Sequence, residues 1–153
     1  MKRITFLPFL LLLITLALGS CEEDNYADWK ILNDEWLETH KTDPGFIQTE
    51  SGLCYKVIHQ GEMGKPNINS VITVRYKGSL IDGTVFEKND RFTKPLSYLM
   101  QGWIEGVRKM NVGGKYILYI PSTLGYGKDG SGDIPPHSTL IFVIELLDSK
   151  NQL

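Results

Sequence analysis

The sequence predicts an α+β fold in which several antiparallel strands pack on one short helix, with a further helix near the N-terminus. Three observations support this prediction. The 153 residues are 42% hydrophobic and 22% charged with a formal charge of −2, which is typical of one globular domain. Alternating apolar residues predominate after Pro44, and 15 glycines and 7 prolines favour short elements joined by tight turns. This composition excludes a helical bundle, a disordered acidic chain and a basic nucleic-acid binder, so we expect no nucleic-acid partner.

Residues 1–20 have the layout of a signal peptide. Lys2 and Arg3 precede an uncharged run, residues 4–18, that is shorter than the about 20 residues needed to span a bilayer. Residues 18–21, Leu-Gly-Ser-Cys, resemble a bacterial lipobox, in which the cysteine is lipidated and becomes the mature N-terminus. We expect Cys21 to carry the lipid; an ordinary cleaved secretory signal and a buried helix are the alternatives. The mature chain then has 14 basic and 18 acidic residues, a charge of −4.

Residues 21–45 are predicted to comprise the lipidated cysteine, an acidic spacer and an amphipathic helix. Residues 22–24, Glu-Glu-Asp, suit a solvated spacer, and they also resemble the acidic signal for surface display in some Bacteroidota lipoproteins. The helix is expected between Tyr26 and His40, because apolar residues recur there every three or four positions: Tyr26, Trp29, Leu32, Trp36 and Leu37. A helix of this length is marginal alone, so it should pack on its own domain or on a partner.

Residues 46–153 are predicted to form the folded domain. Strands are expected around Tyr55 and over residues 71–76, and Asp82-Gly83 predicts a type I′ hairpin turn. A short helix is expected from Gln101 to Met110, because its apolar residues share one face. Strands at 116–120 and 139–147 follow, and the second is apolar enough to lie at the centre of the sheet.

Other kinds of chemistry find little support in the sequence. Residues 125–130 match G-x-G-x-x-G, but no helix is predicted after them, which excludes a dinucleotide site. The three histidines, His40, His59 and His137, are scattered, so we expect no metal and no cofactor. Cys54 is the one other cysteine, and its strand-like surroundings favour a buried thiol over a reactive one.

Aromatic residues gather where the strands, the short helix and the long loop of residues 121–137 should meet. Core packing and an aromatic-lined apolar pocket both explain them. They are Tyr76, Phe86, Tyr98, Trp103, Tyr126 and Phe142.

Five motifs in order, between about Ser51 and Asp148, carry a resemblance to a known family. They are Val74-Arg75-Tyr76-Lys77-Gly78, Asp82-Gly83-Thr84-Val85-Phe86, Gly102-Trp103-Ile104-Glu105-Gly106, Leu124-Gly125-Tyr126-Gly127 and Ile134-Pro135-Pro136-His137-Ser138-Thr139-Leu140-Ile141-Phe142. In this order they resemble the FK506-binding-protein (FKBP)-type peptidyl-prolyl isomerases. The resemblance implies an antiparallel half-barrel wrapped around the short helix. It also implies an enzyme that accelerates rotation about Xaa-Pro bonds of exported proteins, without a cofactor.

The resemblance also implies roles for particular residues. Those that match catalytic positions of the family are Tyr76, Phe86, Glu87, Trp103, Tyr126 and Phe142; those that match substrate-binding positions are Tyr98, Leu99, Met100 and Ile134. Trp103 would form the floor of the pocket, and the Met100 backbone N–H would hold a ligand carbonyl. The chain departs from the family at Glu87, commonly Asp, at Leu96, commonly Phe, and in a shorter link from Tyr98 to Gly102. These departures bear on the geometry of drug-type ligands more than on catalysis.

The implied partners are proline-containing polypeptides, macrolides of the FK506 or rapamycin type, and a membrane reached through the lipid anchor. We expect a monomer, because about 25 residues between Cys21 and Gly45 are too few for the long dimerisation helix of some periplasmic relatives. The expected location is the cell envelope, at a periplasm-facing outer membrane or the cell surface. The alternative function is a holdase or proline-segment binder with little turnover.

Overall fold

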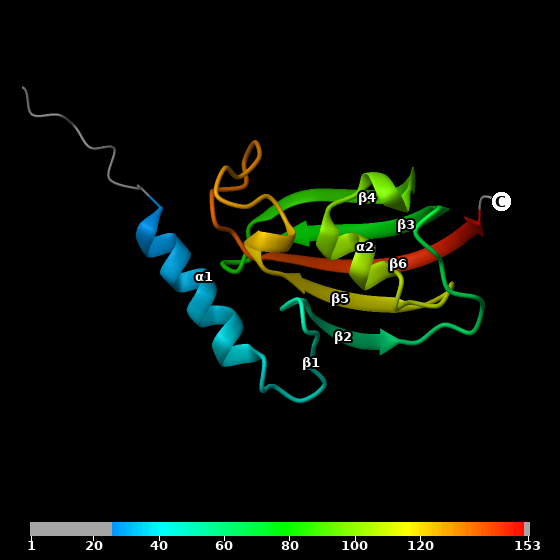
Figure 1. Ribbon diagram of the computed structural model, residues 1–153, viewed down its shortest axis with the longest axis horizontal. Coiled ribbons are helices and arrows are strands. Elements are labelled where there is room, and N and C mark those ends of the chain that lie inside the picture. Colours follow the sequence, from blue (N-terminus) through cyan, green and yellow to red (C-terminus); the bar gives the residue numbers. More distant parts are fainter. Residues whose placement is uncertain (1–25, 152–153) are drawn as a thin grey trace, which may run out of the picture.

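The computed structural model describes residues 26–151, and Figure 1 shows their arrangement. Six strands form one antiparallel sheet in the order β1-β2-β5-β6-β3-β4. The strands are β1 (Ile47–Gln48), β2 (Cys54–His59), β3 (Ser70–Ser79), β4 (Val85–Pro95), β5 (Lys115–Ile120) and β6 (Leu140–Asn151). The helices are α1 (Ala27–His40) and α2 (Gln101–Val107), with 3-10 turns η1 (Leu96–Tyr98) and η2 (Ser122–Leu124). Sheet, short helix and N-terminal helix confirm the predicted α+β class.

The apolar strand β6 lies at the centre, as its sequence predicts. It pairs with β5 on one side and with β3 on the other. Its inward side chains alternate along the strand and are at most 2% exposed: Leu140, Phe142, Ile144 and Leu146. The strand extends four residues beyond the predicted end at Leu147, because residues 148–151 pair with the start of β3.

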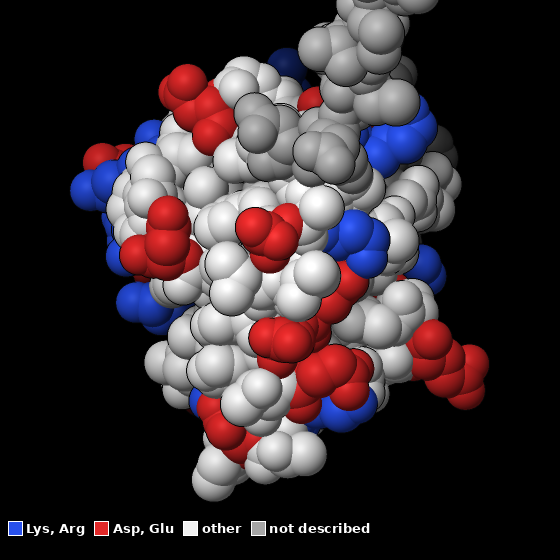
Figure 2. All heavy atoms as spheres, turned by 90° about the vertical axis from the view of Figure 1, so that its left-hand side faces the viewer, with Lys and Arg blue, Asp and Glu red and all other residues white. Residues whose placement is uncertain are grey.

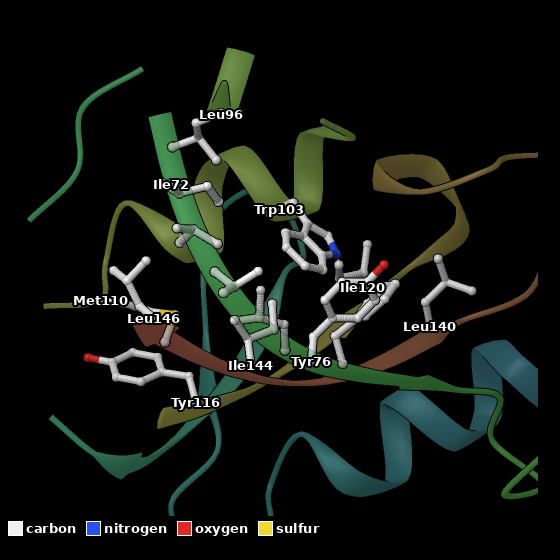
Figure 3. Packing of buried hydrophobic residues seen from close by; sticks show 14 of the residues in the cluster. Ile72, Tyr76, Leu96, Trp103, Met110, Tyr116, Ile120, Leu140, Ile144 and Leu146 are labelled. Atoms are coloured by element: carbon white, nitrogen blue, oxygen red, sulfur yellow. The ribbon is translucent and has the colours of Figure 1, made fainter. Parts of the chain in front are cut away.

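Helix α2 packs on the concave face of this sheet (Figures 1 and 3). Trp103, Val107 and Met110 all point into the core, as predicted, and each is at most 4% exposed. The helix ends at Val107, three residues earlier than predicted. There the N–H groups of Lys109 and Met110 donate to carbonyls three residues back, so the chain tightens into a 3-10-like turn.

The turn between β3 and β4 differs from the type I′ prediction. A type I′ turn needs positive φ at both central residues, whereas Gly83, with φ +88°, is the one residue of this turn in that region. The Gly83 N–H donates to the Leu80 carbonyl, and the Leu80 N–H donates to the Thr84 carbonyl. A longer loop built on an ordinary turn, with glycine in the left-handed position, therefore joins the two strands.

The predicted N-terminal helix is confirmed, but its apolar stripe faces the domain only in part: Trp29 packs against the hydrophobic core and Trp36 against Tyr119. Asn33 is its one buried residue, while Leu32 is 53% exposed. The Asn33 Oδ1 accepts from the Thr139 N–H at 2.7 Å, and Trp29 Nε1 donates to Ser138 Oγ at 2.9 Å. Because these polar contacts add to the packing of the two tryptophans, the hydrophobic pattern predicts only part of the orientation of the helix.

The predicted signal peptide, Cys21 and the acidic spacer lie outside the described residues. Within residues 26–151 no helix is long and apolar enough to cross a membrane. Cys54 is 1% exposed and forms no disulfide, and burial raises the pKa of its thiol. Its position agrees with the prediction of a buried strand cysteine.

Candidate functional site

A pocket opens between α2, the edge strand β4 and the inner face of the sheet. Its volume is about 110 Å³, well below the roughly 300–1,000 Å³ of sites for drug-sized ligands, so it suits a single ring. Seven residues line it: Tyr76, Glu87, Phe92, Leu99, Met100, Trp103 and Phe142. Glu87 is the one charged side chain among them, which makes this an apolar site with a polar rim.

Trp103 forms the base of the pocket and is held by aromatic neighbours. Figure 3 shows it projecting from α2 toward the sheet, near Tyr76 of β3. Its ring lies edge-on to Tyr76, with centroids 5.0 Å apart, and to Phe142, at 5.1 Å. Edge-to-face pairs at this separation add about 0.5–1.5 kcal/mol beyond area burial, so the floor is rigid. The buried Trp103 Nε1 has no hydrogen-bond partner among the described residues.

Met100 begins α2 and lies at the pocket wall. Its carbonyl accepts from the N–H groups of Trp103 and Ile104, both at 3.0 Å, which closes the first turn of the helix. Within residues 26–151 its own N–H has no acceptor. That donor is therefore available beside Trp103 for the carbonyl of a ligand.

Two tyrosines and one carboxylate interact at the rim. Burial raises the pKa of Tyr76 far above its ordinary value, and the nearby Glu87 carboxylate, which interacts with the hydroxyl, raises it further. Burial and then the Glu87 charge also raise the pKa of Tyr126. Both hydroxyls consequently stay protonated, and remain hydrogen-bond donors, at any physiological pH.

The structure gathers most of the predicted site residues around this pocket. Phe86 contacts Phe142 edge-on at 5.5 Å from behind the wall, and Ile134 is buried in the adjoining core. Tyr126 is 37% exposed on the long loop, where its charge interaction with Glu87 places it near the rim. Tyr98 is 82% exposed and is not part of the lining.

Phe92 is a lining residue that the sequence reasoning missed. It contacts Tyr76 edge-on at 5.5 Å. Strand β4 contains two register shifts against β3, so its half-buried residues recur every third position and not every second. The available signal was an isolated phenylalanine among the otherwise polar residues 87–94.

Nucleotide and metal sites find no support in the structure. A pyrophosphate would need a helix N-terminus directly after the glycine-rich residues 125–130. No helix begins within residues 125–139. Among residues 26–151 no three His, Cys, Asp or Glu side chains are grouped as metal ligands.

Comparison with known proteins gives consistent matches. The profile of FKBP-type peptidyl-prolyl cis-trans isomerases matches residues 63–147. FkpA of Escherichia coli K12, an isomerase of this type, is 39% identical over 132 residues, which are 84% of this chain and 49% of that protein. The outer membrane protein MIP of Legionella longbeachae is 38% identical over 126 residues, 79% of this chain and 54% of that protein. The chain thus spans about half the length of these curated relatives.

Solved structures agree with the sequence matches. The crystal structure of E. coli FkpA superposes with a TM-score of 0.81 at 37% identity, covering 84% of this chain and 62% of that one. A peptidyl-prolyl cis-trans isomerase of Pseudomonas syringae pv. tomato superposes with a TM-score of 0.78 at 30% identity, covering 82% and 96%. The fold is thus the FKBP-like half-barrel, and the chain belongs to the family of FKBP-type peptidyl-prolyl cis-trans isomerases.

Proposed function

We propose that this protein accelerates cis–trans isomerisation of Xaa-Pro bonds in exported polypeptides. The observation that carries the proposal is the ring-sized aromatic pocket over Trp103, with free backbone donor Met100 N–H at its wall. Membership of the family gives the same reaction class.

Isomerisation requires loss of amide resonance, a barrier of about 18–20 kcal/mol, and without catalysis it takes tens of seconds. No covalent bond forms or breaks, so neither a nucleophile nor an acid–base pair is required. The twisted amide is less polar than the planar one. An apolar pocket therefore disfavours the planar ground state relative to the transition state, which lowers the barrier.

In this proposal each part of the pocket acts on a different part of the substrate. The proline ring lies over Trp103, between Phe142 and Tyr76, while Phe86 supports Phe142 from behind. The flanking peptide contacts Leu99 in the lining, and it also contacts Ile134 and the exposed Tyr98, which lie outside the lining. The Met100 N–H and the Tyr126 hydroxyl donate to substrate carbonyls, and Glu87 orients Tyr76.

A matched pair of tyrosine variants tests the donor role of Tyr126. Exchange spectroscopy by NMR would measure the interconversion of a short Xaa-Pro peptide with residues 22–153, which contain every described residue. We expect Tyr126→Phe to lower catalysis about two- to tenfold, since one hydrogen bond contributes about 0.5–1.5 kcal/mol. Tyr26→Phe is the control, because Tyr26 is 38% exposed and Tyr126 is 37% exposed. Equal rates in the two variants would remove Tyr126 from the mechanism.

We also propose that Cys21 carries a lipid that anchors the protein in the cell envelope, after removal of residues 1–20. The lipobox-like residues 18–21 and the short apolar run before them support this. The outer membrane location that the MIP name states points to the same compartment. Detergent phase partitioning of the full chain tests the proposal: wild type should enter the detergent phase and Cys21→Ala the aqueous phase. Wild type in the aqueous phase would refute the anchor.

We further propose that the protein is a monomer, because the segment between Cys21 and Gly45 is short, and that its small pocket binds macrolides of the FK506 or rapamycin type weakly. Glu87, with one methylene more than aspartate, lines the pocket where such a ligand would approach. Titration with FK506, followed by Trp fluorescence, should give weaker binding than that of Glu87→Asp. Sedimentation velocity should give one species of monomer mass.

A further inference from the structure

Helix α1 exposes apolar side chains that its own domain does not cover. Ile31 and Leu32 are 54% and 53% exposed, whereas the one buried residue of the helix is the polar Asn33. These two aliphatic side chains add apolar surface to the outer side of a 14-residue helix. One of them, Leu32, lies in a groove.

This groove runs between α1 and the turn that joins β3 to β4, and we call it the α1 groove. Its volume is about 340 Å³, and it is shallow and largely open to solvent. The helix contributes Trp29, Leu32 and Trp36 to its apolar wall, and the turn contributes Ile81. It is separate from the pocket over Trp103, with which it shares no residue.

The walls of the groove are held in place by specific contacts. Trp36 stacks on His40, with centroids 4.0 Å apart, and rests against Tyr119 at 5.7 Å. Trp29 donates to Ser138 and Asn33 accepts from Thr139, which fixes the helix against the domain. A bound segment would therefore enter a preformed site and would not have to order it.

The rim of the groove is acidic. Glu35 and Asp82 lie in its lining, and neither forms an ion pair among the described residues. The lysines nearest to Glu35 in sequence, Lys30 and Lys41, are already paired with Asp34 and Glu38. Figure 2, which views the molecule from the α1 side, shows Asp and Glu distributed over this face around uncharged surface, with some Lys and Arg among them.

We propose that the α1 groove binds polypeptide segments in which a bulky apolar side chain is flanked by Lys or Arg. The apolar side chain would contact Leu32, Trp36 and Ile81, and the cations would face Glu35 and Asp82. Charge disfavours the other occupants. A second copy of the chain would bring two acidic rims together, and an anionic membrane would be repelled by the rim. Residues 22–24 of this chain are acidic and would be repelled as well.

The three tryptophans of the chain provide the readout. Their indole N–H signals, assigned by single Trp→Phe variants, would be followed by NMR while a peptide is added to residues 22–153. The probe is a nine-residue peptide without proline, in which Leu-Phe is flanked on both sides by lysines. We expect the signals of Trp36 and Trp29 to shift and that of Trp103 to stay. The same peptide with glutamate in place of lysine should bind at least tenfold more weakly.

Two matched variants sharpen the test. Leu32→Ala should weaken binding about tenfold, because the variant lacks apolar surface that the bound peptide would cover. Ile31→Ala should not change binding, because Ile31 is equally exposed but lies outside the lining. The double variant Glu35→Gln, Asp82→Asn should flatten the loss of affinity between 10 mM and 150 mM salt, over which the Debye length falls from about 30 Å to about 8 Å.

Several outcomes would overturn the proposal. They are equal binding of the acidic peptide, an equal effect of Ile31→Ala and Leu32→Ala, shifts confined to Trp103, and a concentration-dependent dimer that Leu32→Ala dissolves. Failure of the proposed isomerase activity would not produce any of them, because that activity is read on Xaa-Pro peptides at the Trp103 pocket.

Discussion

At the scale of single residues, two glycines let α2 lie directly against β5. A Cβ atom at Gly102 would be 2.4 Å from Ile120 Cγ2, and one at Gly106 would be 2.4 Å from Leu118 Cδ1. Both contacts are far shorter than real Cβ contacts, and Ile120 and Leu118 are fully buried. Since Trp103 follows Gly102, the position of the pocket floor depends on this close approach.

Gly102→Ala should therefore destabilise the fold. The stiff, buried Ile120 cannot move aside easily, so we expect the free energy of unfolding to fall by about 1–3 kcal/mol, the usual effect of overpacking. Urea denaturation measures it. Gly64→Ala is the control, because a Cβ there meets nothing within 4 Å. Equal denaturation midpoints for the two variants would show that α2 can shift freely.

Four tyrosines whose pKa values are raised in the folded state predict how stability depends on pH. Burial raises the pKa of Tyr76, Tyr116, Tyr119 and Tyr126 in the folded state. As pH rises above about 10, tyrosines of the unfolded chain lose protons that the folded chain still holds, so folding becomes less favourable. The contribution of the protonated tyrosines to the free energy of unfolding is complete below about pH 10. It is lost as the pH rises through their folded-state pKa values.

Thermal unfolding between pH 8 and pH 11 measures this effect. We expect Tm to fall above about pH 10, and to fall less steeply in Tyr76→Phe, which lacks the most strongly shifted of these groups. Tyr98→Phe, with an 82% exposed side chain, should follow wild type. A steeper decline in Tyr76→Phe would contradict the assigned direction.

At the scale of elements, α1 is attached by a few polar contacts. Asn33 Nδ2 donates to the Trp29 carbonyl at 2.7 Å, while its Oδ1 accepts from the N–H of Thr139, the residue before β6. Asn33→Leu would leave the buried Thr139 N–H without an acceptor, which costs about 1–3 kcal/mol. Hydrogen exchange at the Thr139 amide should become faster. Asp34→Asn, at an exposed ion pair, should leave that exchange unchanged.

If Thr139 exchange stayed slow in Asn33→Leu, α1 would be held by its apolar contacts instead. These contacts are the packing of Trp36 against Tyr119 and of Trp29 against the core. The hydrophobic pattern would then have oriented the helix correctly after all.

Sequence reasoning predicted elements better than their contacts, for physical reasons. The strands, the central position of β6 and the core face of α2 follow from periodicity, which is a local property. The orientation of α1 depends also on two polar contacts, of Asn33 with Thr139 and of Trp29 with Ser138, whose partners lie 106 and 109 residues away. The role of Phe92 depends on register shifts in β4 that alternation cannot reveal. The type I′ prediction failed because Asp82 keeps an ordinary φ, so that Gly83 alone takes the positive value.

At the scale of the whole molecule, the two proposed functions, isomerisation and the binding of polypeptide segments, lie on separate surfaces. The pocket over Trp103 accommodates one ring, while the α1 groove, on the helix that follows the expected lipid anchor, offers an acidic, apolar docking site. Most pocket residues could be named from the resemblance, whereas the groove could not, because it depends on how α1 packs against the β3–β4 turn.

The most direct test of the central claim is the exchange rate between cis and trans forms of a short Xaa-Pro peptide, measured by NMR with residues 22–153 and with Trp103→Ala. Far-UV circular dichroism would first establish that the variant is folded, with Tyr126→Phe in reserve if it is not. We expect wild type to accelerate exchange and Trp103→Ala to lose most of that acceleration. A folded wild type that binds the peptide without accelerating exchange would contradict the account and identify a binding protein on an isomerase fold.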